Sequence, residues 1–288
     1  MISIQNLHFD YGNSHYKVFQ DFSLNVPDGK IIGLLGRNGT GKSTLLYLIS
    51  GLLRSKQGTV MVDDNLSQDR NPEMLQNLMI VPEEINLPAV SFREFIKNNR
   101  VFYPNFSEEV LHQVLHDFEL PTALHLGALS MGQKKKVFMA FALATNTKYL
   151  LMDEPTNGLD IPSKMQFRRT ISSQMNDERT IIISTHQVHD VEQLIDHVVL
   201  IEGLHLLVDT STTQLSQLLR FEQRPFGASI DDALYVEPSL SGSAVIAPAR
   251  GKEETPLNLE LLFNALVQYP DLLQKAEVAA NSTEQNNQ

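Results

Sequence analysis

Cysteine is absent from this chain of 288 residues, long apolar runs are absent too, and basic residues are fewer than acidic ones. Without cysteine, disulfide bonds and thiolate metal sites are excluded, which fits a reducing cytosol. No apolar run reaches the roughly 18 to 20 residues that cross a bilayer. The opening stretch MISIQNLHFDYG also lacks the basic flank and apolar core of a signal peptide. We therefore expect a chain that does not enter a membrane unaided.

The charge balance argues against one class of partner. Acidic residues number 34 and basic residues 23, which gives a formal net charge of −11. Such a surface repels nucleic-acid phosphates, so we expect no nucleic acid as the main partner. With 42% hydrophobic and 20% charged residues, the composition is that of a globular protein with one sizeable core and room for a small second domain.

Strand and helix patterns alternate over the first two thirds of the chain. Short apolar or alternating runs predict strands at residues 2–11, 18–26, 30–36, 58–64, 78–82, 148–153 and 179–185. Helical patterns follow the third run and cover 164–175, and this alternation is typical of a parallel α/β sheet. Residues 91–124 are polar and helical, which predicts a helical insertion.

The alternation stops near Asp209. The remaining residues contain two short strand patterns, 233–237 and 243–247, and one amphipathic helical pattern over 258–276. Eleven acidic against five basic residues give this region a charge of about −6. The polar end NSTEQNNQ predicts disorder.

A phosphate-binding loop is predicted at GRNGTGKS, residues 36–43, because this stretch fits G-x-x-x-x-G-K-[ST] and lies between a strand and a helix. Its glycines allow the backbone to curl so that successive N–H groups point at a β-phosphate. Lys42 would bring a positive charge to the β- and γ-phosphate oxygens, and the Ser43 hydroxyl is placed to bind Mg²⁺.

Two carboxylates, Asp153 and Glu154, end the apolar strand YLLMDEP. At the carboxyl edge of a parallel sheet they would emerge beside the phosphate loop, where one can serve the metal and the other can activate water. The alternative is an acidic pair in a solvated turn. A second anion-binding stretch is LSMGQKKK, residues 129–136, in which a serine and a glycine precede what we expect to be the first turns of a helix.

Five motifs occur in order along the chain, namely GRNGTGKST, LSMGQ, LLMDEP, NGLD and ISTH. In this order and spacing they resemble the nucleotide-binding subunit of ATP-binding-cassette (ABC) transporters. The resemblance covers residues 1–208 and implies a P-loop NTPase of the ABC ATPase type. Its α/β fold would have a mostly parallel core sheet, an antiparallel β subdomain and a helical subdomain at about 84–136. Residues 209–288 would form a small acidic α+β extension.

The resemblance also implies ATP and Mg²⁺ as cofactors. The ATP-binding residues that it implies are Tyr11, Gly36, Arg37, Asn38, Gly39, Thr40, Gly41, Lys42, Ser43, Thr44, Ser130, Gly132 and Gln133. Ser43, Asp153 and Glu83 would hold the metal. Glu154 would polarise the attacking water, and His186 would contact the γ-phosphate.

For several of these residues a purely structural role remains the alternative. A histidine after a strand is commonly structural, and so is an aromatic residue such as Tyr11 at a strand end. For Lys134, Lys135 and Lys136 we expect a solvated face or charges that compensate the helix dipole, not ligands.

Members of the family work as head-to-tail dimers, in which each ATP lies between the phosphate loop of one subunit and the signature of the other. Ser130 and Gly132 would then serve the partner's nucleotide, and Asp160 would lie at the seam. Met131 stands where the signature usually has glycine, so we expect tighter packing against the partner. Glu83 stands where the family usually has glutamine, which adds negative charge beside the triphosphate.

We therefore expect an ATPase subunit, a homodimer or a pair with a similar chain, at the inner face of the cell membrane. A separate polytopic permease subunit would dock near Glu83 and the helical insertion. The short insertion and the acidic extension favour export. One alternative is a soluble ABC ATPase acting on DNA, ribosomes or cofactor assembly, but neither long coiled coils nor a second cassette occurs in the sequence. The other is a regulatory module without turnover, against which Glu154 argues.

Overall fold

A six-stranded sheet with the order β10-β9-β3-β8-β7-β6 forms the centre of the computed structural model, which describes residues 1–12, 16–249 and 255–285. Its strands are β3 (Ile31–Leu35), β6 (Leu78–Val81), β7 (Tyr149–Asp153), β8 (Thr180–Thr185), β9 (His197–Glu202) and β10 (His205–Ser211). Neighbouring strands are parallel except for the antiparallel pair β9 and β10. The predicted mostly parallel sheet is confirmed.

An antiparallel sheet with the order β2-β1-β4-β5 packs beside this centre. Its strands are β1 (Ile2–Asp10), β2 (Lys17–Val26), β4 (Gln57–Val62) and β5 (Asn65–Leu66). The second half of β2 alternates buried and exposed side chains, as a strand with one face on a core must. The predicted antiparallel β subdomain is therefore present.

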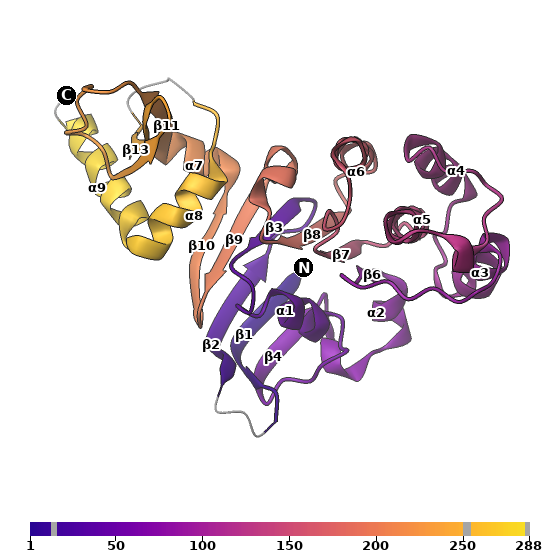
Figure 1. Cartoon of the computed structure of the whole chain (residues 1–288). Helices are drawn as coiled ribbons and strands as arrows, with labels where there is room; N and C mark the ends of the chain where they lie inside the picture. The colour runs from indigo at the N-terminus through magenta and orange to yellow at the C-terminus, as the bar shows by residue number, and fades with distance from the viewer. Residues whose placement is uncertain (13–15, 250–254, 286–288) are drawn as a thin grey trace.

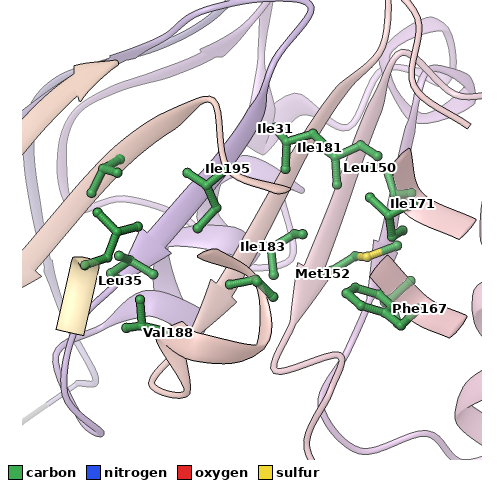
Figure 2. Packing of buried hydrophobic residues seen from close by; sticks show 14 of the residues in the cluster. Ile31, Leu35, Leu150, Met152, Phe167, Ile171, Ile181, Ile183, Val188 and Ile195 are labelled. Carbon is green, nitrogen blue, oxygen red and sulfur yellow. The ribbon is translucent and has the colours of Figure 1, made fainter. Parts of the chain in front are cut away.

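The central strands are apolar on both faces, and each face is covered by a separate layer. In β3, Ile32 and Leu34 face helix α1 (Lys42–Ile49) and the antiparallel sheet, whereas Ile31 and Leu35 face the opposite layer. Figure 2 shows that opposite layer, where Phe167 of helix α6 (Ile161–Ser173) packs against the sheet. This burial on both sides fixes the strand ends from which the polar loops emerge.

The helical insertion lies at the β6 end of the central sheet (Figure 1). Its helices are α3 (Phe92–Asn99), α4 (Glu108–Asp117) and α5 (Met131–Ala144), preceded by the short α2 (Pro72–Gln76). Serine side chains cap the first turns of the three longer helices. In α5, Ser130 and Gln133 form a capping box, in which each side chain binds the other residue's backbone N–H.

The C-terminal region lies at the opposite end, beside β10 (Figure 1). It consists of α7 (Thr212–Leu218), a sheet of β11 (Leu219–Arg224), β13 (Gly242–Pro248) and β12 (Tyr235–Ser239), and helices α8 (Leu259–Gln268) and α9 (Leu272–Gln285). Its apolar residues belong to the same continuous core as α6 and the central sheet. The described part of this region thus shares the core of the central sheet.

Three sequence expectations for this region need correction. The predicted helix over 258–276 is two helices, because Tyr269 leaves the helical conformation before Pro270, as residues that precede proline do. The strand β11 and the helix α7 were not expected. The end of the chain was expected to be disordered from residue 281, but α9 continues to Gln285. Residues 286–288 of that stretch lie outside the described residues.

Within the described ranges, no helix combines the length and apolar character needed to span a membrane.

Candidate nucleotide-binding site

The loop of residues 36–41 joins β3 to α1 at the carboxyl edge of the central sheet. Gly41 caps α1 with φ = 97°, a left-handed conformation that favours glycine. A Cβ at Gly41 would lie 2.7 Å from Val18 Cγ1, so a larger residue would also clash with β2. Glycine is therefore required here both by the backbone conformation and by the close approach of the antiparallel sheet.

Lys42 is buried, with 6% of its surface exposed, and its ammonium points back over the loop. Nζ donates to Gly36 O at 2.8 Å and to Arg37 O at 3.1 Å, and it lies 3.8 Å from Glu154 Oε1. Burial lowers the pKa of Lys42, while the charges of Glu154 and Asp153 act in the opposite direction. Because phosphate oxygens are charged acceptors, they would hold this ammonium more strongly than the two carbonyls do.

Asp153 ends β7 in a buried position beside α1. The Ser184 hydroxyl donates to Asp153 Oδ1. Burial raises the pKa of Asp153, and hydrogen bonds from Ser184 and Ser43 lower it in part. Ser43 and Asp153 are thus brought together, as the sequence predicted.

This pair suits a metal that arrives with its nucleotide. The described residues contain no cluster of three or more acidic or histidine side chains able to hold a metal alone. Mg²⁺ is commonly held by one or two carboxylates, waters and substrate phosphates, so one hydroxyl beside one buried carboxylate fits its needs. The arrangement supports Ser43 and Asp153 as the residues that would hold Mg²⁺.

Glu154 has φ = 43°, an uncommon conformation for a residue other than glycine. Such strain costs on the order of 1–3 kcal/mol and is concentrated at functional sites. Its carboxylate accepts from Thr185 Oγ1 at 3.0 Å and from the His186 backbone N at 3.0 Å, and Nδ1 of His186 lies 2.8 Å from Oε1. The carboxylate is thereby fixed between His186 and Lys42.

Glu83 follows β6 and reaches the same edge of the sheet. Its Oε1 accepts from Asn157 Nδ2 at 2.9 Å. The Glu83 charge opposes the lowering of the Lys42 pKa by burial and adds to the raised pKa of Asp153. The structure therefore places Glu83 within the electrostatic reach of the phosphate loop.

Tyr11 and the signature have different neighbours. The Tyr11 hydroxyl is 2.9 Å from Thr44 Oγ1, and its exposed ring meets Phe9 edge-on, so it flanks the phosphate loop. Ser130 and Gly132 begin α5 instead, and the backbone O of Gly158 lies 3.9 Å from the position of a Cβ on Gly132. The signature is thus beside the NGLD loop, whose Asp160 caps α6 by accepting from Ser163 N at 2.9 Å.

Lys135 was expected on a solvated face or as a charge that compensates the helix dipole, and both expectations are wrong. It lies near the N-terminus of α5, the positive end of the helix dipole, where a cation does not compensate the dipole. It is buried, with 6% of its surface exposed, and its Nζ donates to Glu154 O and to Asn157 O, each at 2.8 Å. Helical spacing offers a signal that the sequence reading missed, because Met139 and Leu143 follow at intervals of four and are buried. Lys135 therefore occupies the core side of α5.

A phosphate loop between a parallel strand and a helix, with an acidic pair at the end of another strand of the sheet, defines a P-loop nucleoside triphosphatase. The sequence profile of the family described as "ABC transporter" matches residues 19–157.

Relatives and solved structures give the same result. "Energy-coupling factor transporter ATP-binding protein EcfA2" of Ligilactobacillus salivarius is 31% identical over 215 residues, 68% of this chain and 73% of that protein. "SkfA peptide export ATP-binding protein SkfE" of Bacillus subtilis is 28% identical over 226 residues, 75% of this chain and 92% of that protein. The structure titled "Structure of ATP binding subunit of ABC transporter" has a similar fold, with a TM-score of 0.67 at 22% identity, over 75% of this chain and 91% of that one. This chain belongs to the ATP-binding proteins of the ABC transporter family.

Proposed function

We propose that this chain is the Mg²⁺-dependent ATP-hydrolysing subunit of an ABC exporter, acting as a head-to-tail homodimer at the inner face of the cell membrane. The observation that carries the proposal is the fixed position of the Glu154 carboxylate, 2.8 Å from His186 Nδ1 and 3.8 Å from Lys42 Nζ. A carboxylate held there can accept a proton from water that attacks a phosphate bound at Lys42. A nucleotide-binding module without turnover has no need of such a group.

Each residue of the site would have its own role in ATP hydrolysis. Lys42 would exchange its two loop carbonyls for phosphate oxygens, and the backbone N–H groups of the loop would hold the β-phosphate. Ser43 and Asp153 would hold Mg²⁺, which supplies positive charge to the phosphates. Glu154 would orient the attacking water and take its proton, while His186 would stabilise charge on the γ-phosphate.

An exposed apolar surface supports dimerisation. Met131 in the signature is 76% exposed, and Ile161, at the start of α6, is 78% exposed. Met165 lies one turn further along α6 and is also exposed. Large apolar side chains are favoured where a partner covers them. Their position beside the signature and the NGLD loop fits a second copy of this chain that presents its ATP to Ser130 and Gly132.

A groove beside β6 supports a membrane partner. It has a volume of about 540 Å³ and lies between α2, β6 and the helical insertion. Among its lining residues are Leu75, Met79, Phe95, Phe102 and Phe138. An apolar groove of this kind suits a short helix of a separate polytopic permease subunit. The short insertion and the acidic extension favour export over import.

Measurements of ATP hydrolysis and of dimer assembly test the proposal. The purified protein should hydrolyse ATP only with Mg²⁺, and Glu154→Gln should lower kcat by about 10²-fold or more. The same variant should still bind ATP in calorimetry and should double its mass in light scattering when ATP is added. Retained hydrolysis in Glu154→Gln would remove this carboxylate from catalysis.

The transport assignment needs a cellular test. Tagged Glu154→Gln protein, captured from detergent-solubilised membranes with ATP, should carry a stoichiometric polytopic membrane protein identified by mass spectrometry. Sedimentation with ribosomes or DNA, and absence from the membrane fraction, would favour the soluble non-transport class of ABC ATPase.

A further inference from the structure

Three consecutive lysines, Lys134 to Lys136, follow the first three residues of α5, but only the middle one is buried. Lys134 and Lys136 are partly exposed, and Lys136 Nζ donates to Gln166 Oε1 of α6 at 2.8 Å. Lys135 instead inserts its ammonium beneath the loop that follows β7, where two backbone carbonyls accept from it. The three side chains thus have different surroundings, and Lys135 is the one that reaches the catalytic loop.

A buried ammonium is costly unless acceptors and opposite charges compensate it. Burial lowers the pKa of Lys135, and the charges of Glu83, Glu154 and Asp153 favour its charged form. An apolar side chain would fill this part of α5 without that cost. The ammonium must therefore contribute something that packing alone does not supply.

The two backbone carbonyls that accept from Lys135 belong to Glu154 and Asn157, and both residues have further contacts in the site. Glu154 is strained, and its backbone is held on both sides, since its N–H donates to Ser184 O at 2.9 Å and its C=O accepts from Lys135. Asn157 accepts from Lys135 through its backbone, while its side-chain amide donates to Glu83. A single ammonium thus connects the signature helix to the backbone of the catalytic carboxylate and to the Glu83 loop.

We infer that Lys135 is a positioning residue, which couples the signature of a subunit to the Glu154 carboxylate of the same subunit. The inference rests on the proposed function, in which the signature contacts the partner's ATP. When that ATP docks on Ser130 and Gly132, a shift of α5 is passed through Lys135 to the backbone of Glu154. Each ATP then prepares hydrolysis of the other one, and the two sites turn over cooperatively.

The test compares Lys135→Met with Lys134→Met, a matched substitution at the adjacent, partly exposed lysine. A small misplacement of a catalytic group can cost about 10²-fold in rate, so Lys135→Met should lower kcat by about 10-fold to 10²-fold. We expect the unaltered protein to show a sigmoidal dependence of rate on ATP concentration. In Lys135→Met this dependence should become hyperbolic. Lys134→Met should match the unaltered protein in both respects.

Binding and assembly separate positioning from a structural role. In a Glu154→Gln background, which prevents turnover, Lys135→Met should leave the ATP dissociation constant within about threefold and should still form the ATP-dependent dimer. Lys135→Gln, which keeps a hydrogen-bond donor without the charge, provides a second variant if Lys135→Met does not fold. It should give an intermediate kcat.

The inference is overturned if Lys135→Met turns over normally, or if it loses ATP affinity in parallel with kcat. These outcomes differ from failure of the proposed function. If Glu154→Gln alone binds ATP but never dimerises, the head-to-tail arrangement is wrong, and the role of Lys135 falls with it. If that dimer forms while Lys135→Met keeps its rate and its sigmoidal response, only the coupling role is wrong.

Discussion

Asn157 Nδ2 donates to Glu83 Oε1 at 2.9 Å, so a side-chain hydrogen bond ties the loop after β7 to the loop after β6. A glutamine at residue 83 would present an amide oxygen to the same donor. The hydrogen bond therefore does not need the carboxylate charge.

From this geometry we predict that Glu83→Gln keeps ATPase activity within about tenfold, which corresponds to about 1.4 kcal/mol or less in the barrier. Glu83→Ala, which removes the acceptor for Asn157, should lose more activity than Glu83→Gln. Steady-state rates at several Mg²⁺ concentrations would measure both. A thousandfold loss in Glu83→Gln would make the charge itself catalytic.

The parts of the site that were predicted from sequence are those encoded by contiguous residues. The phosphate loop is one such part, because glycines, lysine and serine at fixed spacing dictate a local conformation. Asp153 and Glu154 could be placed because a buried strand must deliver its last residues to the carboxyl edge of a parallel sheet. Both predictions needed only the order of strands and helices.

The contacts that sequence reasoning missed depend on tertiary packing. Lys135 is 19 residues from Glu154 in sequence, and their contact forms only when α5 packs against the loop after β7. Likewise, the apolar residues of α8 join the core of the central sheet, although the composition of the C-terminal region suggested a separate unit. No local pattern specifies which distant surface such residues cover.

A second prediction concerns Asp63, which accepts hydrogen bonds from Lys148 Nζ at 2.7 Å and from Tyr149 Oη at 2.6 Å. Burial alone would raise the pKa of Asp63, but these donors and the ammonium of the Met1 N-terminus outweigh it and lower the pKa to about 2. Because the pKa is lower in the folded state than the unfolded value of about 3.9, the carboxylate stabilises the fold above pH 4. That contribution is lost as the pH falls from about 4 to about 2.

Asp63→Asn should therefore destabilise the protein at pH 7, and the difference from the unaltered protein should shrink as the pH falls towards 3. Since the side chain is partly exposed and screened by solvent, we expect about 1 kcal/mol or less. Urea unfolding at pH 7, 4 and 3 measures the effect. A difference that grows on acidification would have the wrong sign for a carboxylate with a lowered pKa.

The third prediction concerns the C-terminal region, which we propose modulates the ATPase domain and is not part of its catalytic site. Helix α8 packs against the short turn at Val188–Asp190, and Leu259 N donates to Glu192 Oε1 at 2.5 Å. A protein that ends at Ser211 should still bind Mg²⁺-ATP in calorimetry. It should unfold at a lower temperature, because truncation exposes the core that α8 covers.

Leu259→Ala in the full chain is the matched control, because it weakens the same packing while α8 is retained. It should cost about 2–5 kcal/mol in the free energy of unfolding, as truncations of buried leucine do. ATP affinity should remain close to that of the unaltered protein. A truncated protein that folds but does not bind ATP would show that residues 212–288 complete the site.

The last prediction tests the head-to-tail arrangement by mixing two inactive proteins. Lys42→Ala removes the ammonium that would hold the β- and γ-phosphates, and Ser130→Arg places a bulky side chain where the partner's ATP would dock. Each variant alone forms a dimer with two defective sites. In a mixed dimer, the intact phosphate loop of the Ser130→Arg chain meets the intact signature of the Lys42→Ala chain, so one complete site is rebuilt.

Mixing should therefore restore ATPase activity in proportion to the mixed dimer formed, provided that one complete site turns over alone. Because some dimers need both sites for turnover, the mass of Glu154→Gln in the presence of ATP provides an independent measure of dimer formation. A protein that cannot activate water should accumulate in the closed, ATP-bound dimer, since only hydrolysis reopens it. If Glu154→Gln binds ATP yet stays monomeric at every concentration, and mixing restores no activity, then Ser130 and Gly132 do not contact a partner's nucleotide. The exposed Met131 and Ile161 would then need a different partner to cover them.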